Sequence, residues 1–215
     1  MDNNFDLEEY QRLWDSYFYP DTNVFVNKKD IKDDDELFNY ERELSTIKIQ
    51  ELHDNPIEGN FDIKHLCDIH KYIFGELYDW AGEFRKVYMK KTDGSYFSPV
   101  DEIEFHLQDN LNIMNKGMRD VYNKDTLADF ITDCYVAFLN THPFRDGNGR
   151  AVREFLREFV VSKTELLWGE PYDIDWSVVN NQLVDELMPF GRAYYGSIRM
   201  EILKAIKPYQ KNKTK

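Results

Sequence analysis

The sequence predicts an all-α protein, a helical bundle interrupted by one short β-hairpin. Apolar residues recur at helical spacing over most of the chain, and β-prone runs flank a turn signal only around residues 86–97. The 215 residues are enough to bury a core, and 15% of them are aromatic, which argues against a disordered acidic chain. We therefore expect a single domain over residues 1–215, with its core at about 33–206, an N-terminal extension at 1–32 and a basic tail at 207–215.

The first predicted elements follow from local signals. Residues 33–52 have helical composition without glycine or proline, and Pro56 marks a stop beyond them. Residues 63–80 carry apolar side chains three and four positions apart, which places them on one helix face, and Gly82 marks the end. Between residues 86 and 97, two β-prone runs flank an Asp-Gly pair, which predicts a hairpin.

The second half of the chain is expected to be helical. Pro99 opens a helix that continues to about Tyr122. The next helix starts near Asp125, carries apolar residues on one face and runs into Asn140. Three more helices are expected at about 149–162, 175–187 and 190–206.

The composition limits the kinds of partner. The chain has 40 acidic against 27 basic residues, a formal charge of −13. Because nucleic acids and anionic membranes bind clustered lysine and arginine, we expect neither as a direct partner. Cys67 and Cys134 lack metal-ligand and disulfide spacing, so both are expected to be buried free thiols. The acidic start has no apolar signal segment, and no apolar run approaches about 18 residues, so the expected location is cytoplasmic.

One segment, residues 142–153 with the sequence HPFRDGNGRAVR, combines several features of a phosphate site. Residues 147–149 are Gly-Asn-Gly, which tolerate positive φ, so their N–H groups can point the same way and form an anion nest. The helix that follows adds unpaired N–H groups at its start. Arg150 and Arg153 lie three positions apart on its first turn and share a face, which suits a polyphosphate.

Two further residues of this segment suggest chemistry as well as binding. Asp146 stands beside the nest and would repel a phosphate unless a divalent cation lay between them. Mg²⁺ held by one carboxylate and by phosphate oxygens is the usual arrangement. His142 opens this segment, and the ordinary pKa of histidine suits general acid–base catalysis near neutrality. Each feature alone is common in turns, but their order and spacing together are hard to produce by chance and favour a polyphosphate site.

The segment His142–Arg150 resembles the signature of Fic-domain proteins, HPFx(D/E)GNGR, at every defined position, and Arg153 matches a second arginine often found three residues later. Tyr19–Lys28 is similar to the family's YPxTNVxxNK segment, and Ile69–Arg85 is similar to IHxYxFxxxYxWAGxxR. The resemblance spans roughly residues 15–200. It implies the Fic fold, a helical bundle with a short β-hairpin flap before the motif.

The resemblance also implies an activity, the transfer of AMP from ATP to a Ser, Thr or Tyr hydroxyl of a target protein. His142 would be the general base, and Asp146 would hold Mg²⁺ that bridges the α- and β-phosphates. The anion hole around the α-phosphate would come from the backbone of three residues and the side chain of the second: Gly147, Asn148 and Gly149. Phe144 is expected to point into the core and fix the loop.

The remaining family roles concern the outer phosphates and the target. Arg150 would bind the β- and γ-phosphates, and Arg153 the γ-phosphate. The flap would add its backbone to an extended segment of the target protein by strand pairing, with Ser95, Tyr96 and Phe97 as the flap residues. Ordinary hairpin packing is the alternative interpretation of these three side chains.

The family pattern leaves the regulation open. Many Fic proteins are inhibited by a helix with an (S/T)xxxE(G/N) motif, whose Glu pairs with the second arginine. Ser98…Glu102 and Ser197…Glu201 match only its first part; Ser98 is better explained by a helix capping box, whereas Glu201 is a candidate for self-inhibition. The alternative hypothesis is inhibition by a separate small helical antitoxin. The chain would then be a toxin or an injected effector, and the sequence favours neither.

Other functions stay possible at this level. Relatives that transfer phosphocholine or other nucleotides share much of the motif, so the donor could be another phosphate compound. A non-catalytic ATP-binding module is opposed by the intact His142. A phosphohydrolase or metal-dependent nuclease would need several metal ligands, but the other four histidines show no such spacing, and His70 is expected to pack in the helical core.

Overall fold

The computed structural model describes residues 7–91, 93–180 and 195–210. Its α-helices are α1 (Leu7–Asp15), α2 (Asp34–Asp54), α3 (Ile63–Phe74), α4 (Ile103–Gly117), α5 (Lys124–Thr141), α6 (Asn148–Trp168) and α8 (Tyr195–Ala205). Short 3-10 turns are η1 (Val100–Glu102), η2 (Met118–Asp120) and η3 (Trp176–Val178). Strands β1 (Tyr172–Ile174) and β2 (Ile206–Pro208) pair antiparallel, with Asp173 opposite Lys207. The predicted all-α class is confirmed.

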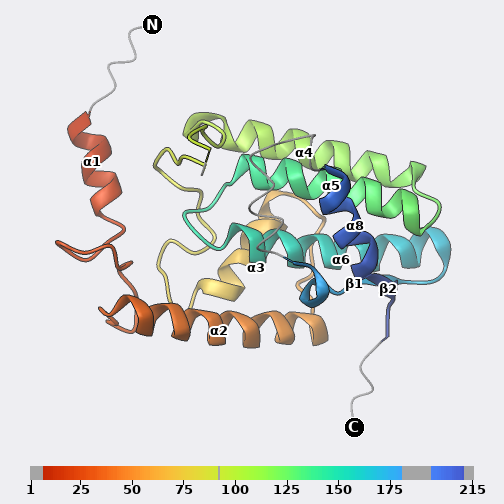
Figure 1. Ribbon diagram of the computed structural model, residues 1–215, viewed down its shortest axis with the longest axis horizontal. Helices are drawn as coiled ribbons and strands as arrows, with labels where there is room; N and C mark the ends of the chain where they lie inside the picture. The colour runs from red at the N-terminus through yellow and green to blue at the C-terminus, as the bar shows by residue number, and fades with distance from the viewer. Residues whose placement is uncertain (1–6, 92, 181–194, 211–215) are drawn as a thin grey trace, which may run out of the picture.

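Helix α6 forms the centre of the bundle. It packs against α3 on one side and α5 on the other, while α2 covers α3, and α4 and α8 cover α5. Figure 1 shows α2 along one edge of the molecule and α4 along the opposite edge. The first three turns of α6 bury Ala151, Val152, Phe155, Leu156 and Phe159. The motif at the start of α6 is therefore anchored in the middle of the core.

Local polar signals set most helix starts. Asp33 caps α2 by accepting a hydrogen bond from the backbone of Glu36, 2.9 Å, and Asp62 caps α3 in the same way. Asn123 and Thr126 form a reciprocal capping box at the start of α5. Each cap satisfies an N–H group that the helix itself leaves unpaired, a contribution of about 1 kcal/mol.

Several expected boundaries differ from the structure. Helix α3 ends at Phe74 and not near residue 80, because the chain turns at Gly75. Leu77 is nevertheless fully buried, because the turn after α3 folds back onto the same core and so continues the apolar pattern. The expected helix at 175–187 begins as the short turn η3, and residues 181–194 lie outside the described residues.

Ser98 does not form the expected capping box. Its hydroxyl bonds to Nδ1 of His106, 2.8 Å, and Pro99 holds the position before η1 without a side-chain cap. Cys67 and Cys134 are both free thiols, as predicted, with Cys134 buried and Cys67 half-buried. Burial raises the pKa of both thiols, so neither is a reactive thiolate near neutrality.

The two ends of the chain contribute more structure than the sequence suggested. The N-terminal extension contains α1, and Tyr17 and Val24 are buried, so the core begins before residue 33. At the other end, Lys207 belongs to β2 and pairs with Asp175 (2.7 Å), although residues 207–215 were expected to form a solvated tail.

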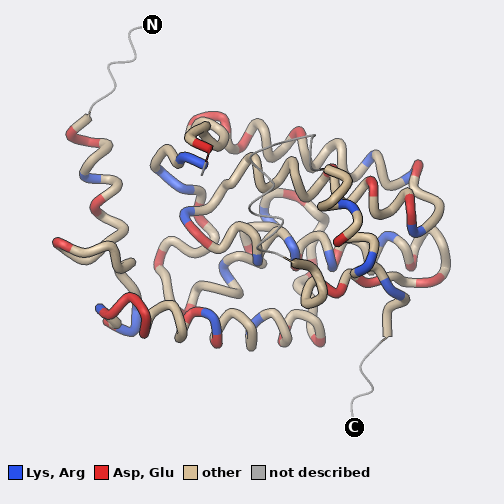
Figure 2. The backbone as a smooth tube through the Cα atoms, in the orientation of Figure 1, with Lys and Arg blue, Asp and Glu red and all other residues tan. Residues whose placement is uncertain are grey.

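Figure 2 shows the acidic residues that open α2 beside the lysines of residues 28–32.

Among the described residues, no helix is both long and apolar enough to cross a membrane.

Candidate active site

His142 stands where α5 ends and the chain enters the glycine loop, defined here as residues 143–149. It is the C-cap of α5 in the left-handed conformation (φ 50°), and its N–H donates to the Phe138 carbonyl, 3.0 Å. The imidazole lies flat against the Phe97 ring, with centroids 3.9 Å apart and planes at 17°. Burial, together with the positive charge of Arg85, lowers the pKa of His142 to about 4. The ring is therefore neutral at physiological pH and can accept a proton.

The glycine loop has a conformation that its residue types require. Gly147 has φ of 73°, and a Cβ there would lie 2.4 Å from the Phe74 ring, so both backbone and space demand glycine. The Asn148 side chain accepts from the Phe144 N–H and donates to the Phe144 carbonyl, both 2.8 Å. In this structure the Asn148 amide thus braces the loop from inside. Phe144 is fully buried, as predicted.

His70 on α3 also supports the glycine loop. Its Nδ1 accepts from the Gly82 N–H (2.9 Å), which leaves the proton on Nε2 to donate to the Asp146 carbonyl (2.9 Å). The ring stacks on Phe144 with centroids 3.8 Å apart. Burial lowers the pKa of His70 to about 4, consistent with this neutral tautomer. The prediction that His70 packs in the core is confirmed, but its bond to the loop has no signal in the sequence.

The two motif arginines have different surroundings. Arg150 pairs with Glu41 (2.5 Å) and donates to the Ser45 hydroxyl (3.2 Å), both from α2, and its guanidinium lies 4.6 Å from the centre of the Phe74 ring. A phosphate bound by Arg150 must therefore compete with a carboxylate.

Arg153 donates to the Tyr135 hydroxyl, 3.0 Å, on α5. A Cβ at Gly149 would lie 3.1 Å from Nη1 of Arg153, so glycine there leaves room for this guanidinium against the loop. Both arginines project from the first two turns of α6, where unpaired N–H groups and the helix dipole add positive potential.

Asp146 brings a single carboxylate to the loop. One of its oxygens accepts from the Gly147 N–H, 2.6 Å. Among the described residues, no three His, Cys, Asp or Glu side chains are grouped so that they could hold a metal by themselves. This donor set suits Mg²⁺ shared between one carboxylate and phosphate oxygens, because that ion keeps few protein ligands.

Arg145, the variable position of the motif, is buried in an aromatic cage from the N-terminal segment. Its guanidinium lies over four rings at 4.8–5.2 Å, those of Trp14, Tyr17, Phe18 and Phe25. Cation–π contacts of this kind stabilise a desolvated cation. The segment before α2 therefore supports the glycine loop, a contact that no local pattern in the sequence predicts.

The hairpin lies directly over His142. Phe97 donates its N–H to the Met89 carbonyl (3.1 Å), and the backbones of Lys90 and Tyr96 form an antiparallel bridge. The predicted hairpin is present as a short bridged turn, with Thr92 outside the described residues. Ser95 bonds to Asp93 within the turn, whereas Tyr96 is 56% exposed. Of the three predicted flap residues, Phe97 is thus the one that contacts His142.

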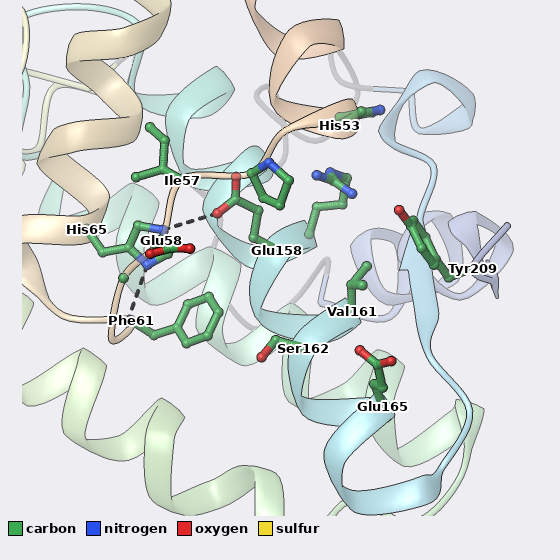
Figure 3. A pocket seen from close by; sticks show the side chains of 13 residues that line it. His53, Ile57, Glu58, Phe61, His65, Glu158, Val161, Ser162, Glu165 and Tyr209 are labelled. Atoms are coloured by element: carbon green, nitrogen blue, oxygen red, sulfur yellow. Dashed lines mark hydrogen bonds and ion pairs between the residues drawn. The ribbon is translucent and has the colours of Figure 1, made fainter. Parts of the chain in front are cut away.

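A second polar cluster lies at the far end of the bundle. A pocket of about 380 Å³ is lined by residues that include His53, His65, Glu158 and Tyr209 (Figure 3). His65 bonds to Glu158 (3.1 Å), and both side chains are buried. Burial raises the pKa of Glu158. None of the predicted site residues lines this pocket, so it is separate from the motif.

The candidate inhibitory residue is engaged away from the motif. The Glu201 carboxylate pairs with Lys204 (2.6 Å) and accepts from the Asn180 N–H (3.1 Å). Within the described ranges, no acidic side chain forms an ion pair with Arg153.

Comparisons with known proteins add independent findings. A family model described as the Fic/DOC family matches residues 60–160. The protein adenylyltransferase VbhT of Bartonella schoenbuchensis is 33% identical over 195 residues, and the match covers 89% of this chain but only 38% of VbhT. A probable protein adenylyltransferase of Sinorhizobium fredii is 29% identical over 155 residues, 70% of this chain and 77% of that protein. The structure of BepC of Bartonella tribocorum, with bound AMPPNP, has a TM-score of 0.74 at 23% identity and covers 91% of this chain and 98% of its own.

Proposed function

The chain belongs to the Fic/DOC family, and on that premise we propose that it is a protein adenylyltransferase. It moves AMP from ATP to a Ser, Thr or Tyr hydroxyl of a target protein and releases pyrophosphate. The observation that carries the proposal is the placement of a neutral His142 at one end of the glycine loop and of Arg150 and Arg153 just beyond the other. A base and a triphosphate cradle thus face one short stretch of backbone.

The cradle binds the donor through groups that the fold leaves available. The first N–H groups of α6 have no intrahelical partner, and they attract an anion together with the helix dipole. Arg150 and Arg153 then bind the outer phosphates, Arg150 by exchanging the Glu41 carboxylate for phosphate oxygens. Because the loop is braced by His70 and Asn148, little of it has to reorganise when charge develops at the α-phosphate.

The proposed reaction is a displacement at the α-phosphorus of ATP. The target hydroxyl gives its proton to the unprotonated nitrogen of His142 while its oxygen attacks the α-phosphorus. The bond to the bridging α–β oxygen breaks, and pyrophosphate leaves with that oxygen. A positioned base of this kind contributes roughly 10²–10⁴-fold to the rate. Asp146 would hold Mg²⁺, which neutralises charge on the phosphates when bound.

The flap is proposed as the docking strand for the target. An extended target segment that pairs with its backbone beside Phe97 would bring a hydroxyl next to His142, because these two rings are stacked. Backbone pairing reads few target side chains, so the flap sequence does not identify the target.

We also propose that the chain is held inactive by a separate helical antitoxin and that it acts as a toxin or effector. The support is that Arg153 has a hydroxyl partner and that Glu201 is paired elsewhere in the described structure. Substitution Glu201→Gly tests this. No change in auto-adenylylation is expected, and a large rise would show inhibition within the chain.

The proposed activity is tested with ATP radiolabelled at the α-phosphate, incubated with the protein and a cell lysate. Label is expected on a protein band with the wild type and not with His142→Ala, and no label is expected from ATP labelled at the γ-phosphate. Binding of ATP without transfer would indicate a non-catalytic module, and label from the γ-position would indicate a kinase. Mass spectrometry of the labelled band would identify the target and its modified residue.

A further inference from the structure

Arg85 follows the Trp80-Ala81-Gly82 turn, and its side chain is 1% exposed. Its guanidinium donates to four backbone carbonyls: Nε to His142 (2.8 Å), Nη1 to Val87 (2.8 Å), and Nη2 to Ser98 (2.5 Å) and Thr141 (3.5 Å). Its own N–H donates to the Pro143 carbonyl, 2.8 Å. One side chain thus bonds to residues that lie between 2 and 57 positions from it in the sequence.

These four carbonyls belong to two structures that must meet during the proposed reaction. Thr141 and His142 are the last residue and the C-cap of α5, where the helix dipole is negative and carbonyls lack intrahelical partners. Val87 and Ser98 are the two ends of the hairpin that carries Phe97. Arg85 therefore ties both ends of the flap to the backbone of the base.

The cation is held by these carbonyl dipoles. Among the described ion pairs, none joins Arg85 to a carboxylate. Burial lowers the pKa of Arg85 to about 10, so the guanidinium stays charged at neutral pH. Because a buried charge without good partners is strongly unfavourable, the carbonyls must stay near the guanidinium, and this restrains the flap and the helix end together.

The restraint also acts on the conformation of His142. That residue has φ of 50°, a region that non-glycine residues enter only when their surroundings impose it. The hydrogen bond from Nε of Arg85 restrains the His142 carbonyl, and the hydrogen bond to the Phe138 carbonyl restrains the His142 N–H. These two bonds restrain the backbone of His142 and therefore the direction of its Cα–Cβ bond, from which the imidazole reaches the Phe97 ring.

We propose that Arg85 is a positioning residue that sets the flap at a fixed distance from the His142 base. This inference rests on the proposed function for its catalytic consequence, but not for its structural one. A planar guanidinium reaches four acceptors in fixed directions, whereas a lysine ammonium at the same place has three donors on one atom and cannot span both ends of the flap.

The test compares Arg85→Lys with a matched control, Arg157→Lys. Arg157 is also buried and paired, but it lies on α6 with Glu154, away from the flap. For Arg85→Lys, hydrogen exchange of residues 86–98 should quicken about 10-fold while α6 stays protected. Transfer of AMP to the target should fall about 100-fold, mainly in kcat, with the Kd for ATP within about threefold of wild type. Arg157→Lys should change neither flap exchange nor transfer.

Three outcomes would overturn the proposal. The first is an Arg85→Lys protein with wild-type flap exchange. The second is one that loses protection throughout the chain, because Arg85 would then be a general core residue. The third is equal loss of flap protection in Arg157→Lys. If the wild type transfers no AMP, the proposed function fails, but the exchange experiment still decides whether Arg85 restrains the flap.

Discussion

Gly147→Ala should disrupt both stability and nucleotide binding, and Gly169→Ala is its matched control. The two glycines have nearly equal φ, 73° and 75°, so an alanine Cβ is strained to the same extent at each, by about 1–2 kcal/mol. The two positions differ in the space available for a Cβ atom. A Cβ at Gly147 would lie 2.4 Å from Phe74, whereas nothing lies within 4 Å of one at Gly169. The clash should add about 1–3 kcal/mol at Gly147 alone.

The consequence for binding follows from what Phe74 supports. Its ring lies under the Arg150 guanidinium and beside His70, so a displaced ring moves both a phosphate ligand and the brace of the loop. In urea unfolding, the free energy of unfolding should be lower for Gly147→Ala than for Gly169→Ala by the contribution of the clash, about 1–3 kcal/mol. Titration with ATP should show weakened binding only for Gly147→Ala. Equal destabilisation of the two variants, with ATP binding intact in both, would refute the reasoning.

Three further predictions follow from the site. Glu41→Gln removes the carboxylate that competes for Arg150, so the Kd for ATP should fall about threefold or more at low salt, and an unchanged Kd would contradict this. Since burial lowers the pKa of His142 to about 4 in the protein without nucleotide, kcat/KM for ATP, which reports the free enzyme, should be equal at pH 7.5 and 6; an ordinary pKa of about 6.5 would lose about three quarters of the rate at pH 6. Arg145→Lys should reduce the unfolding free energy by about 1–2 kcal/mol in thermal or urea unfolding, because an ammonium stacks less well among four rings; wild-type stability would argue against the cage.

The parts of this molecule that the sequence could predict are those encoded by neighbours in the chain. Helix α2 begins beside its Asp33 cap, and the hairpin forms around Gly94, because a capping side chain and a glycine at positive φ act within a few residues. The left-handed turn at Gly147 is predictable for the same reason, since it directly precedes the start of α6.

The supports of the loop could not be predicted in this way. His70 is 76 residues from Asp146, and Arg85 is 57 from His142, so only the fold brings these pairs together. Apolar spacing also misled at the end of α3, because Leu77 is buried by a turn and not by a further helical turn. Burial alone does not distinguish these two cases, whereas the backbone hydrogen bonds do.

In the proposed reaction, the positive charges around the glycine loop would link binding of the donor to the basicity of His142. Burial lowers the pKa of His142, and the buried charges of Arg85 and Arg145 lower it further, so the free imidazole stays unprotonated at the expense of its basicity. A triphosphate bound at Arg150 and Arg153 acts in the opposite direction, because nearby negative charge stabilises the imidazolium. Under the proposed function, the basicity of His142 would therefore rise when the donor binds, and a hydroxyl that arrives without ATP would meet a weaker base. The proposed proton transfer would thus depend on the nucleotide, because its negative charge would offset the effect of the buried arginines on His142.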